Sequence, residues 1–494
     1  MSVVLFLAAC SSSSDNNETA SEKSSPSSSS AEKVMKPVEL KVAFPIFGAE
    51  PKDLGLVQEE INKLTKAKIN ATVELMPISF GNWTQQMNLI LSGNEKLDLT
   101  VSIGSLGAAN KGQLLALDDL LVTYGKGIGE ALGESYLQAG KLNSNIYGVT
   151  SVRDLAANHG VLMRKDLVDK YNINASKIKS LDDLEPVLQL IKEKEPGVVP
   201  LAPGVAGTTF VDGLPLGDPL GDRIAILPGY DNGLKVVNQY EMPEYANMLK
   251  RLHKWYEAGY LLKDAATSQT QANELFKSGK LFADIVAGKP GFLSQQKRMS
   301  GIDYVMVELA PPVATTTDVT KIMWTIPKNA SDPERSMMFL NMMFSDPQLV
   351  NLLDYGIEGK HYVKRVGSEN MIEFPPGLDA SNHPYNMGLN WMMGNQFLSY
   401  VFKGDDPDIW NQMGAFNNNA IKSKALGFIF DPASVKNEMT AVMNVLNQYR
   451  MGLETGTIDP EKNLPAFIAK LKDAGVDKIV AEKQKQLDAW ATSK

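Results

Sequence analysis

The sequence of 494 residues contains one cysteine, so no disulfide can form within the chain and its stability must come from packing. It contains no apolar run of 18 or more residues, and we therefore predict no membrane-spanning helix. Basic residues are fewer than acidic ones, 49 against 57, so the formal net charge is −8; this charge argues against a nucleic-acid partner. The hydrophobic fraction of 44% is that of an ordinary globular protein.

Motifs of catalysis and metal binding are missing as well. The chain has no HExxH, GxSxG or P-loop motif, and the glycine run at 125–129 fails the dinucleotide pattern because Glu130 fills its last position. The acidic residues at 405–408 lack the glycine and the distal glutamate of a calcium loop. The four histidines do not pair at metal-ligand spacing: His159, His253, His361 and His383. We therefore expect no catalytic residue, metal or cofactor, and a protein that is not an enzyme.

The single cysteine, Cys10, follows two alanines and a short apolar stretch. The run Leu7-Ala8-Ala9-Cys10 resembles the lipobox of bacterial lipoproteins, in which the thiol receives a diacylglycerol and the chain is cut just before it. We predict a lipoprotein signal segment at 1–10; the alternative is a buried cysteine in an N-terminal helix. Residues 1–9 contain no Lys or Arg, unlike the start of a signal peptide, so we expect the true start codon to lie upstream.

Residues 11–37 form the next predicted segment. Residues 11–30 are mostly serine and bury too little apolar surface to offset the entropy of ordering the chain. We therefore predict a disordered polar tether over 11–37. Lipid, tether and folded body together predict a protein anchored on the extracellular face of a bacterial cell membrane.

The folded body begins with a regular alternation of strands and helices. Strands are predicted at 38–44, 71–76 and 98–103, with helices at 51–64 and 83–91 between them. This alternation predicts a mostly parallel sheet covered by helices. The chain changes character near residue 150, and the last 130 residues again show helical spacing. With 494 residues, two or more domains are expected.

Several segments, taken in order, resemble the extracellular solute-binding proteins of carbohydrate ABC importers. These segments are Leu91 to Asn94 with Leu97 to Leu99, the run LLALDDLL at 114–121, Ile146 to Thr150, Gly160 to Leu167, Phe276 to Lys289 and Ile326 to Pro347. The C-terminal third resembles a domain of unknown function found in one lipoprotein branch of this family, through Tyr355 to Tyr362, Gly427 to Asp431 and Gln484 to Trp490. The resemblance covers nearly everything after residue 38.

The resemblance implies an α/β, two-lobed fold like that of periplasmic binding proteins, with hinge-linked lobes and a helical C-terminal region. Lobe one would comprise 38–149 and 322–362, and lobe two 150–321 and 363–494. The chain would cross between lobes near 147–153, near 312–324 and again beyond Tyr362. The implied function is capture of a sugar or oligosaccharide by a monomer and its delivery to the permease of an ABC importer.

A sugar site needs aromatic faces and a few fixed polar groups, because sugars present flat C–H faces and rings of hydroxyls. Trp324 is expected near the recrossing, and Trp83 at the carboxyl end of a strand, although both could equally be core residues. Arg153 and Asp154 could bind hydroxyls or pair with each other. The complete set of candidate ligand-binding residues is Trp83, Arg153, Asp154, Lys289, Trp324, Glu358 and Trp391.

Other roles stay open for some of these residues and for the whole chain. Lys289 could be a solvated lysine, and Glu358 could hold its glycine-flanked loop in place. A surface glycosidase or esterase is one alternative function, because two suitably placed carboxylates cannot be excluded from sequence. A peptide-binding or sensor lipoprotein of the same fold is the other, since a fold alone does not give a function.

Overall fold

The computed structural model describes residues 35–492, apart from residues 48, 94, 105, 143, 205, 206, 231, 232, 269, 380, 381 and 386. Cys10, the signal segment and nearly all of the predicted tether lie outside the described residues. Contacts divide the chain into Met1–Lys36 and Pro37–Lys494, and the fold given below is that of the second unit. Among the described residues, no helix is long and apolar enough to cross a membrane.

The first sheet has the strand order β2-β1-β3-β14-β6. Its strands are β1 (Val38–Ile46), β2 (Ala71–Ser79), β3 (Leu99–Ile103), β14 (Ile322–Thr325) and β6 (Val149–Thr150). Strands β1, β2 and β3 are parallel, and β14 runs antiparallel to β3 and β6. The helices α1 (Leu54–Ile69) and α2 (Phe80–Ser92) connect the parallel strands. The predicted strand and helix alternation is therefore confirmed.

Strand β1 is apolar along most of its length because it lies inside the sheet. Leu40, Val42, Ala43 and Phe44 are all buried, because a parallel strand is covered on both faces by helices.

Helix α13 (Pro333–Ser345) begins where the Asp332 carboxylate accepts a hydrogen bond from the amide of Arg335 at 3.0 Å. Helix α14 (Pro347–Tyr355) begins at Asp346 in the same way. The methionines at 337–343 belong largely to the core, as predicted.

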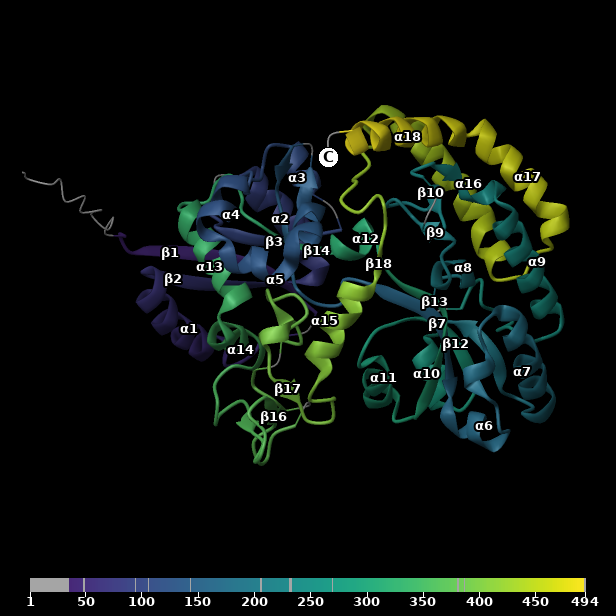
Figure 1. Ribbon diagram of the computed structural model, residues 1–494, viewed down its shortest axis with the longest axis horizontal. Helices are drawn as coiled ribbons and strands as arrows, with labels where there is room; N and C mark the ends of the chain where they lie inside the picture. Colours follow the sequence, from purple (N-terminus) through teal and green to yellow (C-terminus); the bar gives the residue numbers. More distant parts are fainter. Residues whose placement is uncertain are drawn as a thin grey trace, which may run out of the picture. The chain divides into compact units, whose positions relative to one another are not determined.

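The second sheet has the order β18-β13-β7-β12-β8. Its strands are β7 (Ala157–Arg164), β8 (Val199–Pro203), β12 (Leu281–Gly288), β13 (Tyr304–Ala314) and β18 (Ile421–Lys422). Helices α7 (Leu181–Lys194), α9 (Pro243–Glu257) and α11 (Phe292–Ser300) belong to this half of the molecule. The C-terminal helices α16 (Lys436–Glu454) and α17 (Pro460–Asp473) pack on α9, and α18 (Val476–Thr492) packs on α16 and α17 (Figure 1).

Two separate hydrophobic cores lie against the two sheets. The core of the second sheet includes Leu249, Leu446, Leu453, Phe467 and Ile479, so the C-terminal helices complete that core. The chain leaves the first sheet between β6 and β7, and it returns between β13 and β14. A two-lobed α/β fold with C-terminal helices results, as the sequence predicted. We call the two halves lobe one and lobe two.

The division predicted for residues 363–420 needs correction. This segment was expected in lobe two, yet Tyr385, Leu389, Met392 and Met393 lie in the core of lobe one. Its regular elements are β15 (Val363–Lys364), β16 (Met371–Glu373), the 3-10 helix η4 (Gln396–Leu398), β17 (Val401–Phe402) and α15 (Ile409–Asn419). The described residues between them are irregular, so the predicted helical character holds only from α15 onward. The third crossing therefore lies at β18, which pairs with β13 in lobe two, and not just beyond Tyr362. An irregular segment has no hydrophobic period that would reveal its partner.

Candidate functional site

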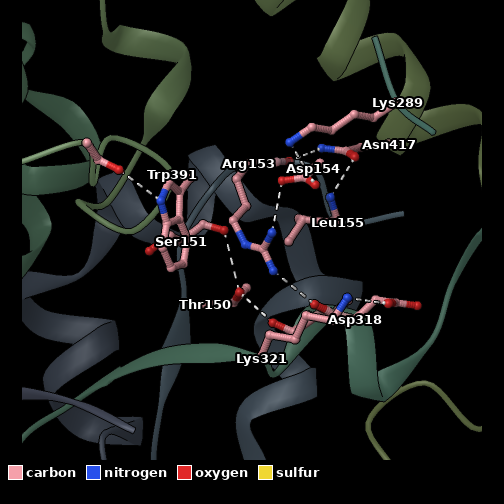
Figure 2. Close-up of polar contacts among 12 residues, drawn as sticks. Thr150, Ser151, Arg153, Asp154, Leu155, Lys289, Asp318, Lys321, Trp391 and Asn417 are labelled. Carbon is pink, nitrogen blue, oxygen red and sulfur yellow. Dashed lines mark hydrogen bonds and ion pairs between the residues drawn. The ribbon is translucent and has the colours of Figure 1, made fainter. Parts of the chain in front are cut away.

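The three crossing segments are joined to one another by hydrogen bonds (Figure 2). Thr150 Oγ1 donates to the carbonyl oxygen of Val319 at 2.7 Å. The side chain of Asn417 accepts from the amide of Leu155 at 2.9 Å and donates to the carbonyl oxygen of Arg153 at 2.6 Å. These bonds fix the backbone on which Arg153 and Asp154 stand. Both side chains are therefore held at the junction of the lobes.

Three charged side chains meet at this junction (Figure 2). Arg153 Nη1 donates to Asp154 Oδ1 at 2.9 Å, and Arg153 Nη2 donates to the carbonyl oxygen of Asp318 at 3.3 Å. Lys289 follows β12 of lobe two, and its Nζ donates to Asp154 Oδ2 at 3.1 Å. The Asp154 carboxylate thus lies between two cations from different parts of the chain. Arg153 Nε is buried and has no hydrogen-bond partner among the described residues.

A cavity of 510 Å³, which we call the hinge cavity, opens beside these charges. Lobe two contributes Lys289, Pro290, Gly291, Gln295 and Arg298, and the hinge contributes Arg153 and Asp154. Five aromatic side chains also line it: Tyr355, Trp391, Tyr400, Phe402 and Trp410. The cavity therefore draws its walls from both lobes and from the irregular segment that follows α14.

Backbone oxygens already accept the polar hydrogens of three of these aromatic residues. Trp391 Nε1 donates to Gly388 at 3.1 Å, and Trp410 Nε1 donates to Ser399 at 2.7 Å. Tyr355 Oη donates to Tyr400 at 3.0 Å, and burial raises the pKa of Tyr355. The rings are thereby fixed in orientation, which lowers the entropy lost when a ligand stacks on them. The guanidinium of Arg153 lies 6.0 Å from the Trp391 ring centroid, within cation–π range.

A larger cavity of 1060 Å³ in lobe two shares Gln295 with the hinge cavity. Its walls include an ion pair, in which the Asp212 carboxylate accepts from Arg450 Nη2 at 2.8 and 2.7 Å. Asp284 in the same wall is buried, and one of its carboxylate oxygens has no hydrogen-bond partner among the described residues. Burial raises the pKa of Asp284 well above its ordinary value. Lobe two therefore contains, next to the hinge cavity, a buried carboxyl group with one oxygen that has no hydrogen-bond partner among the described residues.

Four of the seven predicted residues come together around the hinge cavity: Arg153, Asp154, Lys289 and Trp391. Two tryptophans do not. Trp324 is 0% exposed and its Nε1 donates to the carbonyl oxygen of Met392 at 2.7 Å, so the prediction that it lines the cleft is corrected in favour of the core. Trp83 is likewise buried in the core of lobe one, because its face of α2 turns inward. Glu358 is exposed, 3.6 Å from Lys364 and outside the hinge cavity.

Sequence reasoning missed two exposed phenylalanines. Phe47 follows β1 and Phe80 follows β2, so both lie at the carboxyl edge of the parallel strands. They are 57% and 49% exposed, and their ring centroids lie 4.8 Å apart. Phe47 also lies 6.1 Å from Trp391, which joins this pair to the hinge cavity. The signal that could have identified them is an aromatic residue directly after a predicted strand, whereas the predicted site residue, Trp83, lies three residues beyond Phe80.

Within the described ranges, no group of three or more His, Cys, Asp or Glu side chains could hold a metal ion. The charged groups at the hinge cavity are paired with one another instead. The arrangement suits a ligand that offers flat apolar faces and neutral hydrogen-bonding groups.

Comparison with known proteins identifies the family. Residues 48–349 match the model of the bacterial extracellular solute-binding proteins. A carbohydrate ABC transporter substrate-binding protein of Streptococcus pneumoniae serotype 4 is 31% identical over 450 residues, 90% of this chain and 90% of that protein. The chain belongs to the bacterial extracellular solute-binding protein family. Solute-binding proteins bind and do not catalyse, which confirms the prediction that the chain is not an enzyme. Residues 424–492 match a domain of unknown function, DUF3502, as the C-terminal resemblance predicted.

Solved structures place the two-lobed fold in the same family. The N-glycan transport solute binding protein NgtS from Streptococcus pneumoniae has 31% sequence identity and a TM-score of 0.81, over 92% of this chain and 99% of its own. NgtS in complex with Man5GlcNAc matches with 30% identity and a TM-score of 0.67, over 93% and 99%. The alginate-binding protein AlgQ2 matches with 18% identity and a TM-score of 0.62, over 92% and 98%, and shows the fold alone.

Proposed function

We propose that this solute-binding protein captures an oligosaccharide at the hinge cavity and delivers it to an ABC importer. The observation that carries the proposal is the cavity between the lobes, in which five aromatic rings face a fixed cluster of charged and amide side chains. Sugar rings stack on aromatic faces, and their hydroxyls bond to carboxylates, guanidinium groups and amides. The protein acts as a monomer in this account, with the importer's permease as its partner.

The residues divide the work of binding. Trp391 offers a ring face, and Phe47 and Phe80 extend the apolar surface beyond it. Arg153 and Asp154 hold the polar side of the cavity in one geometry because they bond to each other and to the crossing segments. Such pre-ordered groups lose little entropy when they bind a ligand.

The size of the site supports more than one sugar unit. The hinge cavity of 510 Å³ falls in the range of about 300–1,000 Å³ typical of small-ligand sites. The cavity of 1060 Å³ in lobe two adjoins it at Gln295 and adds further polar wall. The relative NgtS has been crystallised with Man1GlcNAc and with Man5GlcNAc, which supports an oligosaccharide as the ligand class here.

Closure of the lobes around the ligand belongs to this proposal. A ligand that contacts both lobes binds the closed form better and shifts the population toward it. The three crossing segments give an axis for bending. Three NgtS crystal structures match this chain with TM-scores of 0.81, 0.71 and 0.67, the last two with Man1GlcNAc and Man5GlcNAc bound. The three crystal structures of this relative thus match the present chain to different degrees, which supports a mobile hinge in this protein.

The ligand class is tested by a thermal-shift and titration screen of the purified protein. The panel comprises Man1GlcNAc, Man5GlcNAc, a maltooligosaccharide and a tripeptide. A saturating sugar should raise the Tm, because a ligand that binds only the folded state stabilises it. Binding of the peptide with no response to any sugar would favour the peptide-binding alternative and refute the carbohydrate assignment.

Anchoring through Cys10 is the second part of the proposal. The run Leu7-Ala8-Ala9-Cys10 and the serine-rich residues after it support a lipid-anchored protein on the extracellular face of the cell membrane. Cys10→Ala should move the protein from the membrane fraction to the soluble fraction without changing sugar affinity. A Cys10→Ala protein that stays in the membrane fraction would contradict the anchor.

A further inference from the structure

A second cavity of 510 Å³, which we call the side cavity, continues from the hinge cavity. The two cavities share five of their lining residues: Arg298, Tyr355, Asn390, Phe402 and Asp405. Arg298 from α11 of lobe two forms an ion pair with Asp405 from the irregular segment of lobe one. That ion pair lies in the shared wall. The two cavities are therefore neighbouring parts of one groove.

The side cavity is lined by aromatic rings. Phe374 and Phe402 have ring centroids 4.6 Å apart, and Phe374 lies 5.0 Å from the His383 ring. Tyr362 and Tyr385 complete the aromatic wall. The side cavity thus repeats the combination seen in the hinge cavity, with flat apolar faces next to polar groups.

The two imidazoles of the side cavity already use their ring nitrogens inside the protein. His361 Nδ1 accepts from the amide of Ile357 at 2.9 Å, so Nε2 carries the hydrogen and lies 3.0 Å from Asp53. His383 Nε2 lies 2.5 Å from the carbonyl oxygen of His361 and its Nδ1 accepts from the amide of Tyr385 at 3.3 Å. Burial lowers the pKa of His361, in keeping with a neutral ring. These rings serve as walls.

The arginine and lysine side chains that line the side cavity are each paired with a carboxylate. Arg298 pairs with Asp405, and Lys403 pairs with Glu373 at 2.5 Å. An anionic or cationic ligand would have to break one of these pairs. The cavity is therefore suited to an uncharged ligand with hydroxyl groups.

One polar atom in this wall has no partner among the described residues. Asp354 is 6% exposed; its Oδ2 accepts from Ser399 Oγ, while its Oδ1 accepts from no described group. A buried carboxylate oxygen without a hydrogen bond is unfavourable, and native structures rarely contain one without a function or a bound molecule. Burial raises the pKa of Asp354 to about 7. A donor from a bound molecule would satisfy this oxygen.

We propose that the side cavity is a second saccharide subsite, which holds the sugar units that extend beyond the hinge cavity and bonds one of their hydroxyls to Asp354. The inference rests on the proposed function, because the side cavity shares a wall with the hinge cavity. It adds a length preference: a disaccharide is held in the hinge cavity alone, and a longer or branched oligosaccharide also contacts Phe374 and Asp354.

Calorimetric titration of the full chain with Man1GlcNAc and Man5GlcNAc tests the subsite. Phe374→Ala and Asp354→Ala should each raise the Kd for Man5GlcNAc by about 2- to 12-fold, the loss expected for one aromatic contact or one hydrogen bond. Both variants should leave the Kd for Man1GlcNAc within about twofold of the unchanged protein. Val366→Ala is the matched control, since Val366 is fully exposed on the same segment and lies outside both cavities.

Three outcomes would overturn the subsite. Unchanged Man5GlcNAc affinity in both variants would show that no sugar reaches the side cavity. An equal loss for both sugars would show that the substitutions distort the hinge cavity. If the unchanged protein binds neither of these sugars but binds the maltooligosaccharide, the subsite falls although the proposed function stands; if it binds no carbohydrate of the panel, the proposed function falls with the subsite.

Hydrogen exchange of the unchanged protein gives a test without substitutions. The amide of Lys403, which lines the side cavity and not the hinge cavity, donates to Ile372 at 2.8 Å, so this amide reports on the wall of the side cavity. Saturating Man5GlcNAc should slow its exchange, and saturating Man1GlcNAc should not. Identical protection by both sugars, or none by either at saturation, would contradict the subsite.

Discussion

Two tryptophans, one buried in the core and one lining the hinge cavity, should respond differently to truncation. Trp324 is fully buried and donates to the carbonyl oxygen of Met392. Trp391, the residue before Met392, is half-buried and lines the hinge cavity. We predict that Trp324→Ala destabilises the fold, whereas Trp391→Ala weakens ligand binding.

The two magnitudes follow from burial. Truncating a fully buried Trp costs about 3–5 kcal/mol, which lowers the Tm by roughly 6–20 °C for a lobe of ordinary domain size. For Trp391, one stacked ring face is roughly a third of the 150–250 Å² that a buried aromatic covers, worth about 1.3–2 kcal/mol at 25 cal/mol per Å². Ring geometry adds about 0.5–1.5 kcal/mol. The sum of about 1.8–3.5 kcal/mol raises the Kd roughly 20- to 300-fold.

Differential scanning calorimetry and titration with the sugar selected by the screen measure both quantities on the same preparations. Trp83→Ala is the matched control, because Trp83 is buried in the core of lobe one and lies away from the hinge cavity. It should behave like Trp324→Ala in Tm. Normal affinity in a folded Trp391→Ala protein would refute the ring-stacking role and the location of the site.

Three further predictions concern charge, pH and exposed aromatics. Lys289→Met removes the ion pair with Asp154; it should change the free energy of unfolding by less than about 1 kcal/mol and weaken sugar binding in titration. Lower stability with unchanged sugar affinity would show that Lys289 only stabilises the fold. The pKa of Asp354 is about 7 in the fold against 3.8 unfolded, so its contribution to stability is greatest below about pH 4 and is lost as the pH rises toward 7. Between pH 5 and pH 8 the free energy of unfolding should therefore fall by on the order of 2–3 kcal/mol less in Asp354→Asn than in the unchanged protein. If denaturant titrations give the same pH profile for both proteins, the raised pKa of Asp354 is contradicted. Phe80→Ala should leave the Tm nearly unchanged and weaken sugar binding by about 2- to 12-fold, whereas a large drop in Tm would place Phe80 in the core.

The sequence predicted those features that depend on local pattern or on position along the chain. The strands and helices of 38–103 were predictable because their hydrophobic spacing is regular and their ends carry clear signals. Arg153, Asp154 and Lys289 were candidates because they follow the first crossing and strand β12, and the structure brings them together. Their role in binding stays a prediction.

The sequence could not predict which aromatic side chains face the cavity. Trp83 and Phe80 lie three residues apart, and only the turn from β2 into α2 decides that Phe80 is exposed and Trp83 buried. Tyr400 lies in a segment with little regular structure, and Trp410 is the second residue of the helix α15 that follows it, so no hydrophobic period in the preceding chain pointed to either residue. The same segment packs on lobe one through Met392 and neighbours far apart in sequence, which is why its lobe was misassigned. Long-range packing, and not local propensity, decides these positions.

Small-angle X-ray scattering with and without saturating oligosaccharide tests the central claim most directly, namely that the ligand is held between the two lobes. A ligand that contacts Trp391 on one side and Lys289 on the other favours the closed form. The account predicts a smaller radius of gyration on addition of the sugar identified by the screen. An unchanged scattering profile, at a sugar concentration shown by calorimetry to saturate the protein, would contradict it.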